Sequence, residues 1–208
     1  MNSFFPWIYV NFADGSGRRC LFSAPGLKKL SDMESSVVFE RNVVEFVTVA
    51  AEFCSFLEHV GQKQATEAGD VLLKLLPLLY LKASMLPEVE SDDSVSLSQS
   101  VTEQDYDYVR ESVAGLLGSC DDYLEVFTED MKYSDVPVRR TISEDMADIY
   151  QPVRNFVESF KSGVNEVMTE AVACCRDSFA SYWGQSLLNA MRAIHSWRYS
   201  QVDGYDEL

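Results

Sequence analysis

Three carboxylates in the C-terminal half of the chain are the residues best suited to chemistry. Glu144, Asp145 and Asp148 lie within five positions, and Glu144 and Asp148 are four apart. On an α-helix this spacing places both side chains on one face, where their oxygens can bind a hard cation such as Mg²⁺. A structural interpretation competes, because Glu144 follows Thr141 at the capping-box spacing and acids in a first turn suit the helix dipole.

A second acidic stripe could complete a metal site. Glu45, Glu52 and His59 are each seven residues apart. On a helix that faces the first group, they would supply the remaining ligands of a carboxylate-rich di-metal centre in a bundle. The alternative is a row of solvated ion pairs beside the apolar seam of their own helix.

Aromatic and polar residues near the C-terminus form the third candidate, a ligand pocket. Their spacing is helical, and Gly184 allows another backbone to approach closely. The alternative is that the aromatic rings belong to the core. The proposed pocket residues are Trp183, Gln185, Arg192 and His195, accompanied by Tyr182 and Trp197.

The elements that must position these residues are helices. Apolar residues repeat at spacings of four and three along most of the chain, which is typical of amphipathic helices and not of strands. Ser31 with Glu34 and Thr102 with Asp105 fit capping pairs, and Pro77 should bend its helix. The sequence predicts an all-α single bundle of about six helices, over 34–60, 66–86, 102–118, 121–131, 141–163 and 164–199.

The first 32 residues differ from the rest of the chain. They lack helical periodicity, contain three glycines and two prolines, and carry a net charge of +2. The remaining residues carry −18, and Met33 is a plausible initiator. We therefore expect a non-native or flexible, poorly packed N-terminal extension over 1–32, a helical bundle domain over 33–200 and an acidic tail over 201–208.

Charge and cysteine content narrow the partners and the compartment. The net charge of −16 repels nucleic-acid phosphates and anionic membranes, so we expect neither as a partner and predict a protein partner of basic charge. No apolar run is long enough to span a bilayer. The five cysteines are odd in number and lack a Cys-x-x-Cys motif, which favours free thiols in the cytoplasm. The sequence does not predict the oligomeric state.

Several segments carry a resemblance to a known family. They begin at Phe39 (FERNVVEFV), Leu76 (LPLLYLKA), Asp130 (DMKYSD), Ile142 (ISEDMADIYQ) and Tyr182 (YWGQ). Over roughly 37–199 the chain resembles a family of small all-helical bacterial cytoplasmic proteins known only as a domain of unknown function. The resemblance implies a helical fold and transfers no functional residues.

The predicted function is a non-enzymatic interaction or adaptor module without a cofactor. The alternative is a Mg²⁺-dependent nucleotide hydrolase, because Glu144-x-x-x-Asp148 faintly resembles half of the metal motif of all-helical nucleotide pyrophosphohydrolases. Those enzymes also need a Glu-Glu-x-x-Glu run on an earlier helix, which this chain does not contain. Phosphate-binding loops, nucleophile elbows and zinc spacings are likewise missing from the sequence.

Overall fold

A computed structural model of the protein describes residues 37–92, 94–125 and 138–200. The predicted extension (1–32), the predicted acidic tail (201–208) and the Ser31–Glu34 cap lie outside these residues. Within the described part, no helix combines the length and the apolar character needed to cross a membrane.

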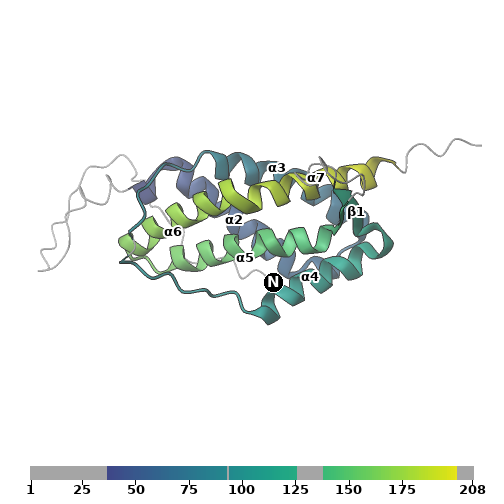
Figure 1. Ribbon diagram of the computed structural model, residues 1–208, viewed down its shortest axis with the longest axis horizontal. Coiled ribbons are helices and arrows are strands. Elements are labelled where there is room, and N and C mark those ends of the chain that lie inside the picture. Colours follow the sequence, from purple (N-terminus) through teal and green to yellow (C-terminus); the bar gives the residue numbers. More distant parts are fainter. Residues whose placement is uncertain (1–36, 93, 126–137, 201–208) are drawn as a thin grey trace, which may run out of the picture.

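The described residues form five long helices around one core (Figure 1). Helix α5 is central, because it packs against α2, α4, α6 and α7, while α3 packs against α2 and α7. The fifth helix is a continuous rod in which a π-turn joins α6 to α7. The helices are α2 (Arg41–Glu58), α3 (Ala65–Ser84), α4 (Glu103–Leu117), α5 (Ile142–Lys161), and the rod of α6 (Asn165–Ser178), the π-turn (Phe179–Trp183) and α7 (Gly184–Tyr199).

The count of about six helices is wrong because the predicted helix over 121–131 begins as a strand. Strand β1 (Asp122–Glu125) pairs antiparallel with β2 (Val138–Thr141), with Asp122 opposite Thr141 and Glu125 opposite Val138. Leu124 points to solvent and Glu125 is buried, the reverse of what a helix with an inward Leu124 requires. A pairing with residues 13 or more positions away decides the local structure, and spacing within 121–131 does not encode that pairing.

The start of the first predicted helix differs from the prediction, and the start of the third agrees with it. The first begins later than expected: a 3₁₀ turn over Val37–Phe39 buries Val38, and α2 starts only at Arg41. The capping box predicted for α4 is confirmed, since the Thr102 hydroxyl accepts from the Asp105 backbone N–H and Asp105 accepts from the Thr102 N–H. Local capping chemistry therefore fixes the start of α4.

The core follows the predicted apolar stripes. Phe46 and Phe53 of α2, Leu79 of α3 and Ile149 of α5 are fully buried in one cluster. Burying a side chain of this size stabilises the fold by roughly 1.5–3 kcal/mol relative to leaving it exposed. Pro77 lies inside α3 as expected, on its solvent side.

Helices α3 and α7 are antiparallel and unusually close. Tyr80 of α3 stacks edge-on against Phe179, and Asp70 pairs with Arg198 at the other end of the contact. Between them, a Cβ atom on Gly69 would lie 2.7 Å from the Trp197 ring. A glycine is therefore required at position 69 for the two helices to approach this closely.

Candidate functional site

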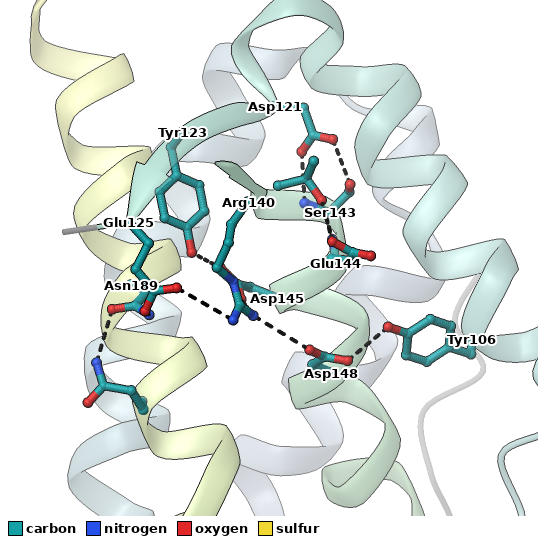
Figure 2. A network of polar contacts seen from close by, with 12 residues as sticks. Tyr106, Asp121, Tyr123, Glu125, Arg140, Ser143, Glu144, Asp145, Asp148 and Asn189 are labelled. Atoms are coloured by element: carbon teal, nitrogen blue, oxygen red, sulfur yellow. Dashed lines mark hydrogen bonds and ion pairs between the residues drawn. The ribbon is translucent and has the colours of Figure 1, made fainter. Parts of the chain in front are cut away.

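One polar cluster lies where the strand pair meets the start of α5 (Figure 2). Its centre is Arg140 at the end of β2, whose Nη2 atom lies 2.7 Å from Asp145 Oδ1 and 3.9 Å from Asp148 Oδ2. Its Nη1 atom lies 3.6 Å from Glu125 Oε2. We call these four residues, with the tyrosines and the asparagine that bond to them, the Arg140 cluster.

Hydroxyl and amide donors complete the Arg140 cluster. The Tyr123 hydroxyl donates to Asp145 Oδ2 at 2.5 Å. The Tyr106 hydroxyl of α4 donates to Asp148 Oδ1 at 2.8 Å, and Asn189 of α7 donates to Glu125 Oε1 at 2.8 Å. Donors from α4, β1 and α7 thus meet acceptors on β1 and α5, so the cluster ties separate elements together.

Burial sets the protonation chemistry of the cluster. The Asp145 carboxyl is fully buried, and this burial raises its pKa to about 6, although the Tyr123 hydroxyl and Arg140 oppose the increase. Burial and hydrogen bonds to carboxylates also raise the pKa values of Tyr106 and Tyr123 above the ordinary range. One guanidinium faces three carboxylates, so a proton retained on Asp145 relieves an excess of negative charge.

The three carboxylates predicted to bind metal occupy different environments. Glu144 is exposed, and its backbone N–H donates to Thr141 Oγ1, as the capping interpretation predicted. Asp145 and Asp148 belong to the Arg140 cluster, where both oxygens of Asp145 already accept hydrogen bonds. The arrangement accounts for these acids as partners of a cap, a guanidinium and tyrosines.

The second predicted stripe lies on α2 and makes other contacts. Glu45 pairs with Arg41 and with Lys82 of α3, Glu52 is exposed, and the ring of the exposed His59 hydrogen-bonds the Ser55 carbonyl. Within the residues that the structure describes, no three His, Cys, Asp or Glu side chains converge in a way that could hold a metal ion.

A second region of interest is the outward-facing groove between α3 and α7. It contains a shallow hollow of about 480 Å³, and Leu188, one turn before Met191, continues its edge at 36% exposure. We call this hollow with Leu188 the α3/α7 groove. Its lining residues are Leu73, Met191, Arg192, His195 and Tyr199.

An exposed apolar row on α3 accompanies the groove. Leu78, Leu81 and Met85 are 41%, 52% and 41% exposed, and their spacing of three and four places them on one face of the helix. Tyr199, which lines the groove at the C-terminal end of α7, is 51% exposed. Exposure of apolar side chains to water is unfavourable, so covering this row with another surface would lower the free energy.

The structure brings together only part of the predicted pocket. Arg192 and His195 line the same hollow, and the His195 ring packs against Tyr199 with centroids 4.8 Å apart. Trp183 is instead fully buried, and its indole N–H donates to Ser178. Gln185 is exposed and donates to Asn189, so it supports the Arg140 cluster.

The remaining members of the aromatic segment have structural roles. A Cβ atom on Gly184 would lie 2.6 Å from the Phe179 carbonyl oxygen, so the close approach expected there is made to the backbone of the π-turn. Trp197 packs on Gly69. A second hollow of about 470 Å³ lies on the other side of α7, between Trp197, Arg192 and Tyr123 of β1.

Comparisons with known proteins bear on all of these residues. A family model described as a domain of unknown function, DUF5063, matches residues 37–200. The chain belongs to the DUF5063 family. The match spans every described residue of the Arg140 cluster and the α3/α7 groove, so both are parts of the DUF5063 domain.

A solved structure supports the same fold for this DUF5063 chain. It is similar to the crystal structure of protein BF1032 from Bacteroides fragilis, with a TM-score of 0.71 and 44% sequence identity. The similarity covers 79% of this chain and 96% of that one. No curated protein matches the chain.

Sequence reasoning missed the centre of the polar cluster and the apolar row. Arg140 falls between the predicted helices over 121–131 and 141–163, and only the pairing of β1 with β2 brings it to Glu125 and Asp148. Leu78, Leu81 and Met85 did carry a local signal, since helix α3 has apolar residues on more than one face. Such a row can be found from the sequence when a helix contains more apolar residues than its inward stripe accounts for.

Proposed function

We propose that this DUF5063 protein is a non-enzymatic protein-interaction module, and that its docking surface is the α3/α7 groove with the neighbouring row of Leu78, Leu81 and Met85. The observation that carries the proposal is the exposure of this apolar row beside an apolar hollow. Exposed apolar surface that is grouped, and not scattered, is typical of sites that another protein covers.

The shape of this surface favours a slender occupant. Two antiparallel helices border the groove, with Leu73 on the α3 side and Met191 and Tyr199 on the α7 side. An amphipathic segment of a partner can place apolar anchors between such helices. Met191, which lines the groove, suits this role, because a flexible thioether adapts to different side chains.

The net charge of the chain, −16, favours a partner with positive charge. Complementary charge increases the association rate and disfavours wrong partners. Beside the groove itself, Arg198 of α7 is already paired with Asp70 of α3, so the groove offers mainly apolar contacts.

The cysteines are consistent with a cytoplasmic location. Cys54, Cys120, Cys174 and Cys175 are free thiols, and Cys54 and Cys175 are buried. Free thiols persist where the compartment is reducing. We therefore propose that the module acts in the cytoplasm, which is also where the adaptor function was expected.

A photo-cross-linking experiment tests the docking surface. A photoreactive amino acid replaces Leu188 in the groove or, as a matched control, Tyr108, which is 55% exposed on α4. After illumination in cells, we expect a product with a second protein from position 188 and not from position 108. Leu81→Glu, which places a charge in the apolar row, should abolish that product.

Purified components then decide between occupants. The cross-linked protein, identified by mass spectrometry, should bind the purified module, and Leu81→Glu should weaken the affinity at least tenfold. Equal products at positions 188 and 108 would contradict the proposal. A product consisting of two copies of this chain would assign the groove to self-association.

A further inference from the structure

The hollow between β1 and α7 has the size and the lining of a small-molecule site. Its volume is about 470 Å³, and ligand pockets in proteins typically measure about 300–1,000 Å³. Its wall is largely apolar, and we call it the β1/α7 hollow. Two aromatic rings and three aliphatic side chains supply most of that wall, from Tyr123, Trp197, Leu124, Ile142 and Ala193.

Contacts elsewhere in the protein hold the walls of this hollow in place. The Tyr123 hydroxyl donates to Asp145, whose carboxyl is fully buried (Figure 2). The Trp197 ring lies against Gly69 of α3, where a Cβ atom would be only 2.7 Å away. Ile142, the first residue of α5, is 1% exposed and belongs to the core. Side chains with such partners are not free to close the site, so the hollow is formed before a ligand arrives.

The charged side chains that line the hollow are already engaged within the chain. Asp122 pairs with Arg139, and Arg192 donates to the Leu124 carbonyl. A charged ligand would lose its hydration here without meeting an opposite charge that lacks a partner, which is unfavourable. The net charge of −16 adds repulsion against an anion. The ligand that fits this hollow is therefore uncharged.

We propose that the β1/α7 hollow binds an uncharged, planar, fused-ring aromatic molecule. The rings of the ligand pack against Tyr123 and Trp197, because aromatic pairs are stabilised in offset or edge-to-face contact. Burial of its surface against Leu124 and Ala193 supplies the larger part of the affinity. The exposed Ser196 offers a hydroxyl at the edge of the hollow, and a hydrogen bond to it sets the orientation of the ligand.

This site is separate from the docking surface proposed above. Among the described residues that line the hollow, only Arg192 also lines the α3/α7 groove. The hollow takes a small molecule and the groove takes a protein segment, so the proposal does not depend on the docking function.

Titration with a fluorescent dye tests the site in the full chain. The probe is N-phenyl-1-naphthylamine, an uncharged aromatic molecule whose fluorescence increases in apolar surroundings, and we expect a saturable increase with the wild type. Leu124→Glu places a charge in the wall and should weaken binding at least tenfold. Tyr108→Glu is the matched control, because Leu124 and Tyr108 are both 55% exposed, and it should leave the affinity unchanged.

A second pair of variants fills the hollow instead of charging it. Ser196→Trp places a large side chain at the edge of the hollow and should also weaken binding at least tenfold. Ser98→Trp, at an exposed position in the connection between α3 and α4, is its control. Both serines are exposed, so both variants should keep the fold, and their melting temperatures check this.

Cys120 lines the hollow and reports where the dye lies. Iodoacetamide alkylates an accessible thiol, and mass spectrometry measures the extent of reaction at each cysteine. Saturating dye should slow the alkylation of Cys120 at least fivefold and leave that of Cys174, an exposed thiol on α6, unchanged.

The outcomes separate this site from the groove. The absence of saturable binding, or equal affinities in the wild type, Leu124→Glu and Ser196→Trp, would overturn the proposal. Binding that is lost in Leu188→Glu and retained in both hollow variants would place the dye in the α3/α7 groove and would overturn it as well. None of these results changes which protein position 188 captures, so the docking function is tested separately.

Discussion

The Arg140 cluster and the α3/α7 groove differ in how far their side chains are satisfied within the chain. In the cluster, Asp145 accepts bonds from both Arg140 and Tyr123, and Tyr106 bonds to Asp148. In the groove, Leu188 and Tyr199 are exposed and packed only in part. Among the described residues the buried Arg140 Nε atom has no hydrogen-bond partner, but the carboxylates and tyrosines of the cluster do. A region whose polar groups largely have partners holds the fold together, whereas a region with uncovered apolar surface is available for binding.

The largest expected effect tests whether the cluster is structural. Arg140→Met removes the cation and leaves three carboxylates together, so we expect a loss of about 3–5 kcal/mol in the free energy of unfolding. Arg139→Met is the matched control, because Arg139 is 73% exposed and its pair with Asp122 is on the surface; it should cost less than about 1 kcal/mol. Urea unfolding of both variants measures the difference, and equal losses would contradict the comparison.

The second prediction concerns pH. The pKa of Asp145 in the folded protein, about 6, is higher than its ordinary value of 3.8. The stabilisation from the protonated carboxyl is therefore complete below pH 3.8 and is lost as pH rises through 6. Relative to Asp145→Asn, the wild type should lose up to about 3 kcal/mol between pH 4 and pH 7, at about 1.4 kcal/mol per pKa unit.

Chemical denaturation of both proteins across this pH range checks the sign. A wild type that gains stability relative to Asp145→Asn as pH rises would show that Arg140 dominates over burial. The pKa of Asp145 would then lie below its ordinary value.

The third prediction concerns the contact that forms the groove. Gly69→Ala places a methyl group against the Trp197 ring, so α3 and α7 must separate, at a cost of about 1–3 kcal/mol. Gly115→Ala in α4 is the matched control, since its Cβ would meet no atom within 4 Å. Because alanine favours helix, the control should stabilise the protein by up to about 1 kcal/mol. Thermal melts that shift in the same direction would contradict this account.

The smallest expected effect concerns metal. Because Asp145 and Asp148 already bond to Arg140 and tyrosines, we expect millimolar Mg²⁺ to leave the melting temperature unchanged. Any ligand that binds only the folded state raises that temperature by mass action. An increase that disappears in Asp148→Asn would therefore support the hydrolase alternative and would assign chemistry to the cluster.

How much the sequence predicts depends on the range of the interactions involved. The helix at Thr102 follows from a contact three residues away, and both capping residues were identified in advance. The strand at Asp122 depends on Arg139 and Arg140, and the cluster depends on residues from Tyr106 to Asn189. Spacing within a short window cannot encode such distant pairings.

Only the α7 side of the groove was predicted, because only its residues are close together in the sequence. Arg192 and His195 lie on one face of one helix, so local spacing indicated that they could share a site. The opposite side of the groove, at Leu73, belongs to another helix, so spacing along α7 could not indicate it. The prediction that Trp183 lines a pocket is wrong, because its large apolar ring is buried in the core. An aromatic ring at helical spacing is most often buried.

The π-turn between α6 and α7 has a consequence for the phase of the helical rod. Cys175, Phe179, Trp183 and Leu187 follow one another at intervals of four, and all but the half-buried Phe179 are buried. On a regular α-helix each interval of four rotates about 40° past a full turn, so three intervals would drift by about 120°. A turn closed by i→i+5 bonds holds roughly one residue more and absorbs most of this drift.

The same face of the rod therefore stays against the bundle, although its buried residues are spaced at four and not at the 3.6 residues of an α-helical turn. Removing a single residue from Phe179–Trp183 would restore uniform winding and rotate α7 by about 100° relative to α6. The same deletion would turn Leu187 out of the core and carry Arg192 and Tyr199 away from α3. One inserted position in the helix is thus what gives the molecule a groove on that side.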